Sequence, residues 1–239
     1  MNLRRDGARP LVIGHRGAAG VAPENTLASL EAAVRAGADI VEFDVSPGLV
    51  LAHSPGETPA DAITLDRALA YLAGAGVGVH VDVKLGGYER DVVAALRAHG
   101  LEDRALVSTA LPQVGRALAA VAPALPRAIG YPRDRLGVSR FRWPPAATTA
   151  GAAALRTVVP VRVPLLLRQA RANVLALHHT LCSRASIAAA HRSGAAVLAW
   201  PVSDAATALR LANLGVDAIV SDDPETTLGA LESQYRRVH

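Results

Sequence analysis

Acidic side chains interrupt two short runs of the sequence that are otherwise apolar. Glu42 and Asp44 alternate with apolar residues in the run 40–45, and His80, Asp82 and Lys84 alternate with valines in the run 77–85. Successive side chains of a strand point to opposite faces, so each polar set shares one face of its strand. Where the two faces converge, three carboxylates repel one another unless they are protonated or bridged by a cation.

A divalent cation is the ligand that these carboxylates predict. Mg²⁺ and Ca²⁺ prefer carboxylate oxygens, and the single cysteine of the chain lies in a different segment, which argues against a soft-metal site. Glu42, Asp44 and Asp82 are therefore the candidate ligands of one divalent cation, Mg²⁺ or Ca²⁺. A second interpretation stays open, in which they are ordinary ion-pair partners of Arg16 and Lys84, since ionic networks also occur inside proteins.

Two histidines lie at the ends of apolar runs in the same way. His15 ends the first run, and His53 follows the run 49–52 directly. Imidazoles exchange protons near neutral pH, so two of them beside a cation-bound phosphate can serve as general base and general acid. His178 and His179 end a later run and are candidates by position alone.

The elements that must position these residues alternate along the chain. The expected strands are 11–17, 40–45, 77–85, 105–109, 126–131, 174–180, 196–202 and 218–221. Helical patterns cover 26–36, 88–99, 112–121, 183–192, 205–214 and 225–236, with a further helix from Leu65 and a partly helical region 143–171. In that region Pro144, Pro145, Pro160 and Pro164 are expected to break the helix.

Eight strand–helix units predict an α/β fold with a parallel sheet, a TIM-like (β/α)8 barrel. An open doubly wound sheet is less well supported, because no Gly-x-Gly-x-x-Gly follows the first strand. Active sites of such barrels lie at the carboxyl ends of the strands, where the polar residues above are expected. No linker or internal repeat is visible, so residues 1–239 are expected to form a single domain.

The composition excludes several other classes of protein. The chain has 239 residues, of which 51% are hydrophobic, enough to offset the entropy of ordering, so a disordered chain is excluded. A disulfide scaffold is excluded by the lone Cys182. No apolar stretch approaches the roughly 20 residues that span a bilayer, so no stable membrane insertion is expected. The N-terminus has no secretory signal pattern, which predicts a cytoplasmic location.

The isoelectric point of the chain is as high as that of many nucleic-acid-binding proteins, but its basic residues are not clustered as they are in such proteins. The isoelectric point is about 9.8, yet the net charge is only +4 and the arginines form no run longer than a pair. Aromatic residues make up 3% of the chain, too few for stacking platforms, so nucleic acid is not an expected partner. Lys84 is the only lysine among the 25 basic residues.

Several motifs taken together resemble those of the glycerophosphodiester phosphodiesterase family. Near the N-terminus they are His-Arg-Gly at 15–17, Pro-Glu-Asn-Thr at 23–26 and Gly-Ala-Asp-Ile-Val-Glu-Phe-Asp-Val at 37–45. Near the C-terminus they are Val-Leu-Ala-Trp at 197–200 and Gly-Val-Asp-Ala-Ile-Val-Ser-Asp-Asp-Pro at 215–224. The resemblance covers most of the chain except about 111–171.

This resemblance implies an enzyme that uses one divalent metal to hydrolyse glycerophosphodiesters to glycerol phosphate and an alcohol. It implies histidine acid/base catalysis through a cyclic phosphate, with a small-molecule phosphodiester as partner, and it implies no particular oligomeric state. The implied roles are metal ligation by Glu42, Asp44 and Asp82, acid/base catalysis by His15 and His53, phosphate binding by Arg16 and Lys84, support of that loop by Glu24 and Asn25, and lining of the pocket by Trp200.

The sequence departs from the family pattern between Ser46 and Asp82. Ser46-Pro47-Gly48 replaces the usual Thr-x-Asp-Gly, the third carboxylate is Asp82 where Glu is usual, and the helical insertion after the second histidine is missing. The chain therefore resembles a short form of the family. Two alternatives follow. One is a lysophospholipase D-like phosphodiesterase, whose branch shares the Asp ligand and the missing insertion. The other is a non-catalytic barrel that binds phosphorylated ligands.

Overall fold

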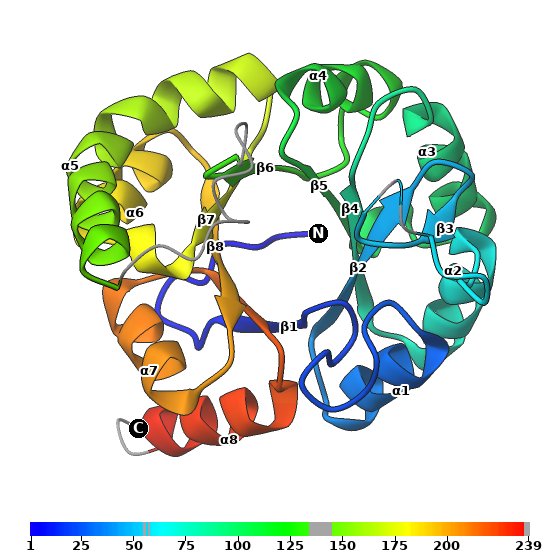
Figure 1. The fold of residues 1–239 in the computed structure, drawn as a ribbon, viewed down its shortest axis with the longest axis horizontal. Coiled ribbons are helices and arrows are strands. Elements are labelled where there is room, and N and C mark those ends of the chain that lie inside the picture. Colours follow the sequence, from blue (N-terminus) through cyan, green and yellow to red (C-terminus); the bar gives the residue numbers. More distant parts are fainter. Residues whose placement is uncertain (55, 57, 134–144, 237–239) are drawn as a thin grey trace.

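Eight parallel strands of the chain close into a barrel that is surrounded by helices (Figure 1). The structure is a computed structural model that describes residues 1–54, 56, 58–133 and 145–236. Around the barrel, in the described residues, the strands follow the order β1-β2-β4-β5-β6-β7-β8-β9, and β1 closes the ring by pairing with both β2 and β9. The predicted TIM-like (β/α)8 barrel is confirmed.

The barrel strands are β1 (Leu11–Gly14), β2 (Ile40–Ser46), β4 (Gly78–Val83), β5 (Ala105–Thr109), β6 (Arg127–Tyr131), β7 (Val174–His178), β8 (Ala196–Val202) and β9 (Ala218–Ser221). The helices are α1 (Leu27–Arg35), α2 (Leu65–Ala75), α3 (Glu89–Ala98), α4 (Pro112–Val121), α5 (Pro145–Ala170), α6 (Arg184–Arg192), α7 (Ala205–Leu214) and α8 (Pro224–Tyr235), with the short 3-10 turns η1 (Glu102–Arg104) and η3 (His179–Leu181). A further short strand, β3 (Val50–Leu51), pairs antiparallel with the end of β2 and carries the chain toward His53.

Local sequence signals fix where several helices begin and end. Thr26 and Ser183 start α1 and α6 with capping boxes, in which the side chain three residues later returns the hydrogen bond. Asp204 caps α7, and Gly215 ends it with φ of 91°, a left-handed conformation that glycine adopts without a Cβ clash. These caps place each helix end, and hence each loop between helix and strand, at a defined position.

Three apolar cores hold the barrel together. Two outer cores lie between the strands and the helices, one under α1 to α4 and one under α5 to α8. The third fills the barrel interior with residues such as Ile13, Ile40, Leu106 and Leu198, and Leu3 of the N-terminal segment joins it. Because side chains alternate along a strand, the residues that follow Ile40 and Leu106 at even spacing also point inward, toward the mouth of the barrel.

Helix α5 runs without interruption through Pro160 and Pro164, so the prediction that these prolines break it was wrong. Each proline lacks an N–H, so the carbonyl four residues earlier loses its helical donor. The first part of α5 is largely exposed, so water can satisfy these carbonyls. On the other face Val159, Val163 and Leu167 are buried in the outer core, and this packing holds the helix on the barrel.

The start of α5 also differs from expectation. Pro145 begins the helix, at a position where proline is tolerated because the first N–H groups of a helix have no helical partner. Pro144 and the start of the predicted region at 143 lie outside the described residues.

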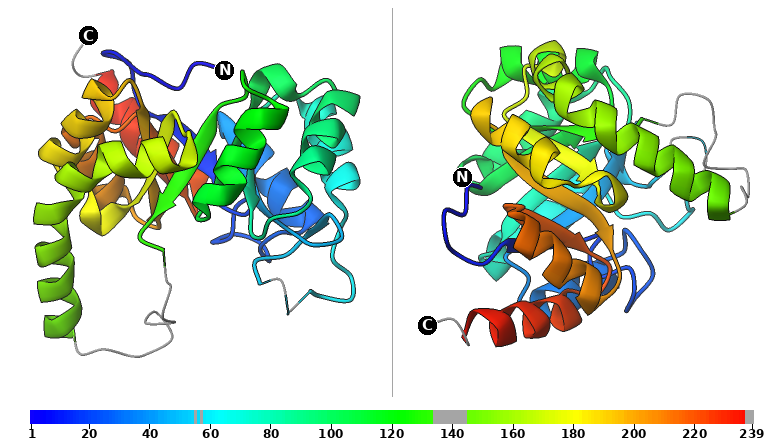
Figure 2. Two further views of the ribbon diagram at one scale, coloured as in Figure 1. Left: turned by 90° about the horizontal axis from the view of Figure 1, so that it is seen from above. Right: turned by 90° about the vertical axis from the view of Figure 1, so that its left-hand side faces the viewer.

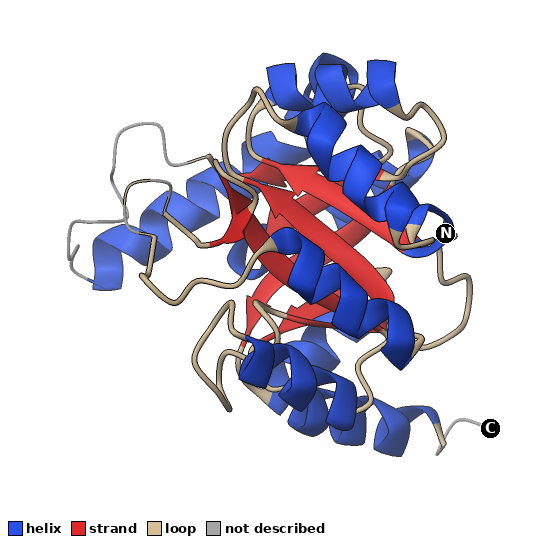
Figure 3. Cartoon of the chain, turned by 90° about the vertical axis from the view of Figure 1, so that its right-hand side faces the viewer, coloured by secondary structure: helices blue, strands red, loops and turns tan. Residues whose placement is uncertain are grey.

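The first part of α5 projects beyond the barrel on the side where the loops after β1 and β3 lie (Figure 2). The helices form a continuous outer layer around the strands, and the loops extend at both ends (Figure 3). Among the described residues, none of the helices combines the length and the apolar character needed to cross a lipid bilayer.

Candidate active site

The three predicted carboxylates meet inside the mouth of the barrel. Glu42 and Asp44 lie on β2, and Asp82 lies beside them on β4, where it is in register with Asp44. One carboxylate oxygen from each residue lies within 4.8 Å of the other two. Glu42 and Asp44 are buried, with 4% and 1% of their surface exposed, while the side chain of Asp82 is 24% exposed. The side chains are therefore grouped as a single cation would require.

Asp44 is the most heavily coordinated of the three. Its Oδ2 lies 3.0 Å from Asn25 Nδ2, 3.1 Å from His53 Nδ1 and 3.1 Å from Arg16 Nε, and its Oδ1 lies 2.6 Å from Lys84 Nζ. Burial alone would raise the pKa of this carboxyl. The hydrogen bond from His53 and the charges of Lys84 and Arg16 outweigh burial and hold the pKa well below its usual range.

Glu42 has a different environment from that of Asp44. The described residues give its carboxylate one hydrogen bond, from the amide of Arg16 to Oε2 at 2.7 Å. Burial raises the pKa of Glu42 well above its usual value, and the nearby carboxylates of Asp44 and Asp82 raise it further. A buried carboxyl of this kind gains most from a cation that neutralises it, which fits the donor set to a hard divalent ion.

Lys84 joins two of the carboxylates, and the ion-pair interpretation is therefore partly correct. Its Nζ lies 2.6 Å from Asp44 Oδ1 and 2.5 Å from Asp82 Oδ2. Burial would lower the pKa of Lys84, but the two carboxylates reverse this effect and raise it. One lysine and one arginine face three carboxylates here, so Glu42 lacks a cationic partner of its own among the described residues.

The loop after β1 is held in a strained conformation that brings Arg16 to this cluster. Arg16 and Asn25 have φ of 49° and 59°, values that side-chain-bearing residues rarely adopt. Between them Gly17 has φ of 82°, and a Cβ there would come within 2.5 Å of Ser29. Only glycine fits this close approach between the loop and α1.

Both predicted histidines lie at the mouth, each with a carboxylate on Nδ1. His15 Nδ1 lies 2.6 Å from Asp222 Oδ1, and His53 Nδ1 lies 3.1 Å from Asp44 Oδ2. The other ring nitrogen of His53, Nε2, lies 3.5 Å from Arg16 Nη2. A carboxylate on Nδ1 fixes the ring orientation and leaves Nε2 as the nitrogen that exchanges protons.

The remaining predicted residues surround this centre at different depths. Glu24 is exposed and its Oε2 lies 2.5 Å from Arg16 Nη1, whereas Asn25 is buried and also accepts the amide of Asp44 at 2.9 Å. Trp200 on β8 packs above the interior core, and the ring of His178 meets it edge-on at 5.3 Å. The two rings therefore lie together at the ends of neighbouring strands β7 and β8.

Three polar residues without a predicted role extend the hydrogen bonds of the predicted ones. Asp222, directly after β9, orients His15. Ser108 on β5 donates to Asp82 Oδ1 at 2.5 Å, and His80 Nε2 lies 2.7 Å from the same serine oxygen. A signal was present for each, because all three fall on or just after a barrel strand, and His80 shares the polar face of Asp82.

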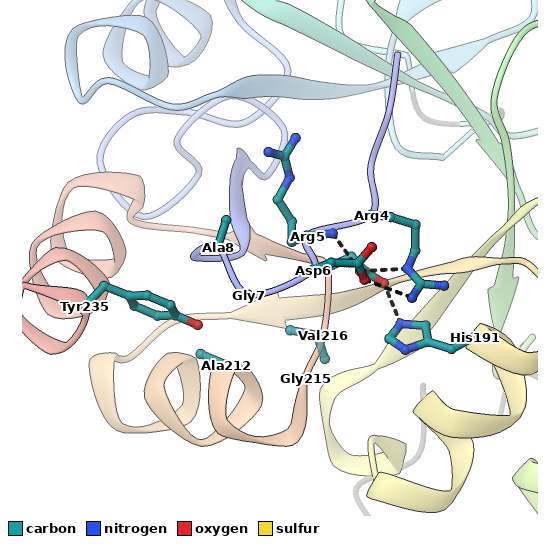
Figure 4. A pocket seen from close by; sticks show the side chains of 11 residues that line it. Arg4, Arg5, Asp6, Gly7, Ala8, His191, Ala212, Gly215, Val216 and Tyr235 are labelled. Atoms are coloured by element: carbon teal, nitrogen blue, oxygen red, sulfur yellow. Dashed lines mark hydrogen bonds and ion pairs between the residues drawn. The ribbon is translucent and has the colours of Figure 1, made fainter. Parts of the chain in front are cut away.

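A cavity of about 280 Å³ lies at the opposite end of the barrel and contains none of the predicted residues (Figure 4). It is lined by the N-terminal segment around Arg4 and Arg5, by the end of α6 at His191, and by Asp217 and Tyr235. His191 and Arg4 both contact Asp217 there. Asp217 is thus paired with a histidine and an arginine, whereas Glu42 at the mouth has no cationic partner among the described residues.

Comparison with known proteins gives the same family as the motifs. The sequence profile of the "Glycerophosphoryl diester phosphodiesterase family" matches residues 15–47 and 82–226, well over half of the chain. The unmatched stretch 48–81 holds His53 and the place of the missing insertion. Over 234 residues the chain is 26% identical to the Bacillus subtilis (strain 168) protein YhdW, assigned as a glycerophosphodiester phosphodiesterase, covering 90% of this chain and 95% of YhdW.

Solved structures show the same fold at lower sequence identity. A phosphodiesterase from Oleispira antarctica, in complex with the product sn-glycerol-3-phosphate, matches 94% of this chain and 97% of its own with a TM-score of 0.72 and 24% identity. A glycerophosphodiester phosphodiesterase from Agrobacterium tumefaciens matches 92% of this chain and 99% of its own, with a TM-score of 0.67 and 20% identity. From the profile match and the site at the barrel mouth, the chain belongs to the glycerophosphoryl diester phosphodiesterase family and is a phosphoric diester hydrolase.

Proposed function

We propose that this protein hydrolyses glycerophosphodiesters to glycerol phosphate and an alcohol, with one divalent cation held by Glu42, Asp44 and Asp82. The observation that carries the proposal is the grouping of these three carboxylates within 4.8 Å, between two histidines that each have a carboxylate partner. When bound, the cation would supply positive charge to the phosphate oxygens. Family membership supports the same reaction.

The contacts of His53 favour it as the general base. Arginine has no acceptor atom, so Arg16 Nη2 donates to His53 Nε2, and that nitrogen carries no proton. The ring proton then lies on Nδ1 and is donated to Asp44. His53 Nε2 thus has the lone pair of a general base, and when Arg16 turns from it to the phosphate, Nε2 takes the proton from the hydroxyl next to the phosphodiester, whose oxygen attacks phosphorus.

His15 supplies the complementary step. Asp222 accepts from Nδ1 of His15 and stabilises the protonated ring, which gives its Nε2 proton to the departing alcohol as the bond from phosphorus to that oxygen breaks. The product of this step is a cyclic phosphate. Water opens the ring with the two histidines in exchanged roles and leaves glycerol phosphate. The attack within one molecule gains from proximity, worth up to roughly 7–11 kcal/mol in well-oriented cases.

Arg16 and Lys84 would bind the phosphate beside these histidines. Arg16 contacts both Glu24 and Asp44, and burial of its guanidinium is outweighed by Asp44 and Glu24, which raise its pKa. Its charge therefore persists throughout the working pH range. Lys84 lies between two of the proposed metal ligands, where it can neutralise carboxylate charge as well as meet a phosphate oxygen.

The test is hydrolysis of a glycerophosphodiester followed by ³¹P NMR, with Mg²⁺ and Ca²⁺ compared. The expected products are glycerol phosphate and the free alcohol, with a cyclic phosphate resonance as an intermediate. A diester in which hydrogen replaces the neighbouring hydroxyl should not react, because it lacks the attacking oxygen. Turnover of that analogue at a normal rate would contradict the cyclic route, and absence of turnover on all diesters would favour the non-catalytic alternative.

One observation favours a second substrate, a lysophospholipid that retains an acyl chain. Leu155, Val158, Val161 and Leu165 of α5 are exposed, Val161 by 82%, and the first part of this helix projects on the same side as the site (Figure 2). An apolar helix face left in water usually has an apolar partner. Val161→Glu should then raise KM for a lysophospholipid and leave KM for a glycerophosphodiester unchanged, whereas Ala94→Glu, at an exposed position of α3, should change neither KM.

A further inference from the structure

We infer that His80 and Ser108 are positioning residues that orient the short third carboxylate, Asp82, for the cation. The inference rests on the proposed metal site. Aspartate is one methylene shorter than glutamate, so its oxygens reach less far into the mouth and depend more on the groups that hold them. The neighbouring strand supplies such a group, because Ser108 on β5 is in register with Asp82 on β4.

The number of donors and acceptors fixes where the hydrogen atoms lie in the series His80, Ser108 and Asp82. An ionised carboxylate only accepts, so the single hydroxyl hydrogen of Ser108 is donated to Asp82 Oδ1, at 2.5 Å. The serine oxygen can then only accept from His80, 2.7 Å away, which requires a proton on His80 Nε2. The donation therefore runs in one direction, from His80 through Ser108 to Asp82.

An unpaired nitrogen agrees with this assignment. His80 is buried, with 3% of its surface exposed, and its Nδ1 has no hydrogen-bond partner among the described residues. A proton on Nδ1 would be a buried donor without an acceptor as well as a loss of the bond to Ser108. A buried unpaired lone pair is the smaller cost, so the ring is held with its proton on Nε2.

The arrangement leaves each oxygen of Asp82 with one fixed donor. Oδ1 accepts from Ser108, and Oδ2 accepts from Lys84 at 2.5 Å. Hydrogen bonds in a chain polarise one another, so the donation from His80 strengthens the bond from Ser108 to the carboxylate. The rotation of the Asp82 carboxylate is thereby fixed before a cation binds, and groups that orient a ligand in this way tune metal affinity.

The test is Mn²⁺ affinity, measured by electron paramagnetic resonance, together with kcat at saturating metal. Ser108→Ala should weaken Mn²⁺ binding about 10–100-fold, while kcat at saturating Mn²⁺ stays within a few-fold of the unaltered protein. Ser108→Thr, which keeps the hydroxyl, should bind Mn²⁺ more tightly than Ser108→Ala. Thr109→Val, one residue along and on the opposite strand face, should leave Mn²⁺ binding unchanged.

Variants of His80 test the first link in the chain. His80→Gln keeps a side-chain donor and should retain more Mn²⁺ affinity than His80→Leu, which has none. Thermal melting identifies any variant that fails to fold. If a His80 variant fails, the comparison of Ser108→Ala with Ser108→Thr still tests whether the serine hydroxyl orients Asp82. Absence of Mn²⁺ binding by the unaltered chain would contradict the proposed function itself. Normal binding together with an unchanged affinity in Ser108→Ala would overturn only the inference about positioning.

Discussion

Buried carboxylates occur at both ends of this barrel, and their surroundings differ. At the end where the strands begin, Asp217 accepts the amide of Val197 and His191 Nε2 on one oxygen, both at 2.8 Å. The other oxygen accepts the amide of Arg5 at 3.1 Å and lies 3.5 Å from Arg4 Nε (Figure 4). Asp39, at the same end, is held by both terminal nitrogens of Arg9.

At the mouth the donors are shared unevenly among the carboxylates. Glu42, Asp44 and Asp82 share the cations Lys84 and Arg16, and Glu42 is left with a single amide donor among the described residues. The strain in the loop at Arg16 adds to this cost. A carboxylate that is saturated with donors stabilises the fold. Glu42, which is short of donors in a strained site, is arranged with Asp44 and Asp82 to bind something else.

The largest expected effect of a substitution is at the histidines of the mouth. His15→Ala or His53→Ala should each lower kcat by about 10²–10⁴-fold, because each removes a proton-transfer group. His191→Ala at the other end is the matched control, since it also removes a histidine that bonds an aspartate. Measured at saturating metal, His191→Ala should keep kcat unchanged. Equal losses in kcat for all three variants would remove the distinction between the two ends.

A pair of isosteric substitutions separates the two kinds of carboxylate. Glu42→Gln should abolish tight cation binding while leaving the metal-free protein at least as stable, because it removes a buried charge that lacks a cationic partner. Asp217→Asn should lower the free energy of unfolding by about 2 kcal/mol, since it disrupts several charge-assisted hydrogen bonds, with normal turnover by the folded fraction. Chemical unfolding gives the free energy of unfolding of each variant, and cation titration gives its cation affinity. A stability loss in Glu42→Gln that matches Asp217→Asn would contradict this account.

Lys84→Arg tests whether a point charge is required between Asp44 and Asp82. A guanidinium is broad and planar and cannot place one nitrogen against both carboxylates as Nζ does. Loss of one charge-assisted contact predicts a fall in kcat/KM of about 10–100-fold. Steady-state kinetics on Lys84→Arg and Lys84→Met measure it. Kinetics unchanged by Lys84→Arg would show that any cation suffices at this position.

The smallest effect is a pH dependence of thermal stability in the metal-free protein. Burial, with Asp44 and Asp82, raises the pKa of Glu42 above its usual 4.5, so the folded state binds this proton more tightly than the unfolded state. The associated stability is present below about pH 4.5 and is lost as pH rises through the raised pKa. Asp44 and Asp82, whose pKa values are lowered, act in the opposite sense only at lower pH.

A cation needs the deprotonated form of Glu42, so it competes with that proton. The gain in melting temperature on adding Mg²⁺ or Ca²⁺ should therefore be larger at about pH 8 than at about pH 5. Glu42→Gln should remove most of this difference, and Asp217→Asn should retain it. Thermal shift assays at the two pH values provide the comparison. An equal gain in melting temperature at the two pH values would show that protonation of Glu42 does not compete with the cation.

The fold and the grouping of the carboxylates followed from sequence because both depend on local periodicity. Alternation placed Glu42, Asp44 and Asp82 on inward faces, and adjacent strands then had to bring them together. The continuation of α5 through Pro160 did not follow, because the packing of Val159 and Val163 against the barrel outweighs the missing hydrogen bonds. Local rules for proline contain no information about such tertiary packing.

The sequence indicated that polar residues lie at the strand ends, but not which of them contact each other. Asp222 contacts His15 across 207 positions, and Ser108 contacts Asp82 across 26. Only the closure of the barrel and the strand register determine which of several polar residues at strand ends meet. The strain at Arg16 and Asn25 likewise arises from the fit of the loop to α1 and β2, and not from a local preference of either residue.

If the carboxylates of the mouth hold a cation that the hydrolysis needs, removal of that cation must stop turnover. The most direct measurement is the rate of glycerophosphodiester hydrolysis by chelated protein as Mg²⁺ or Ca²⁺ is added back, with bound metal determined on the same samples. We expect no turnover in chelator and a rise in rate that saturates at about one cation per chain, and we expect no such rise in Glu42→Gln. Full activity in chelator would contradict this expectation.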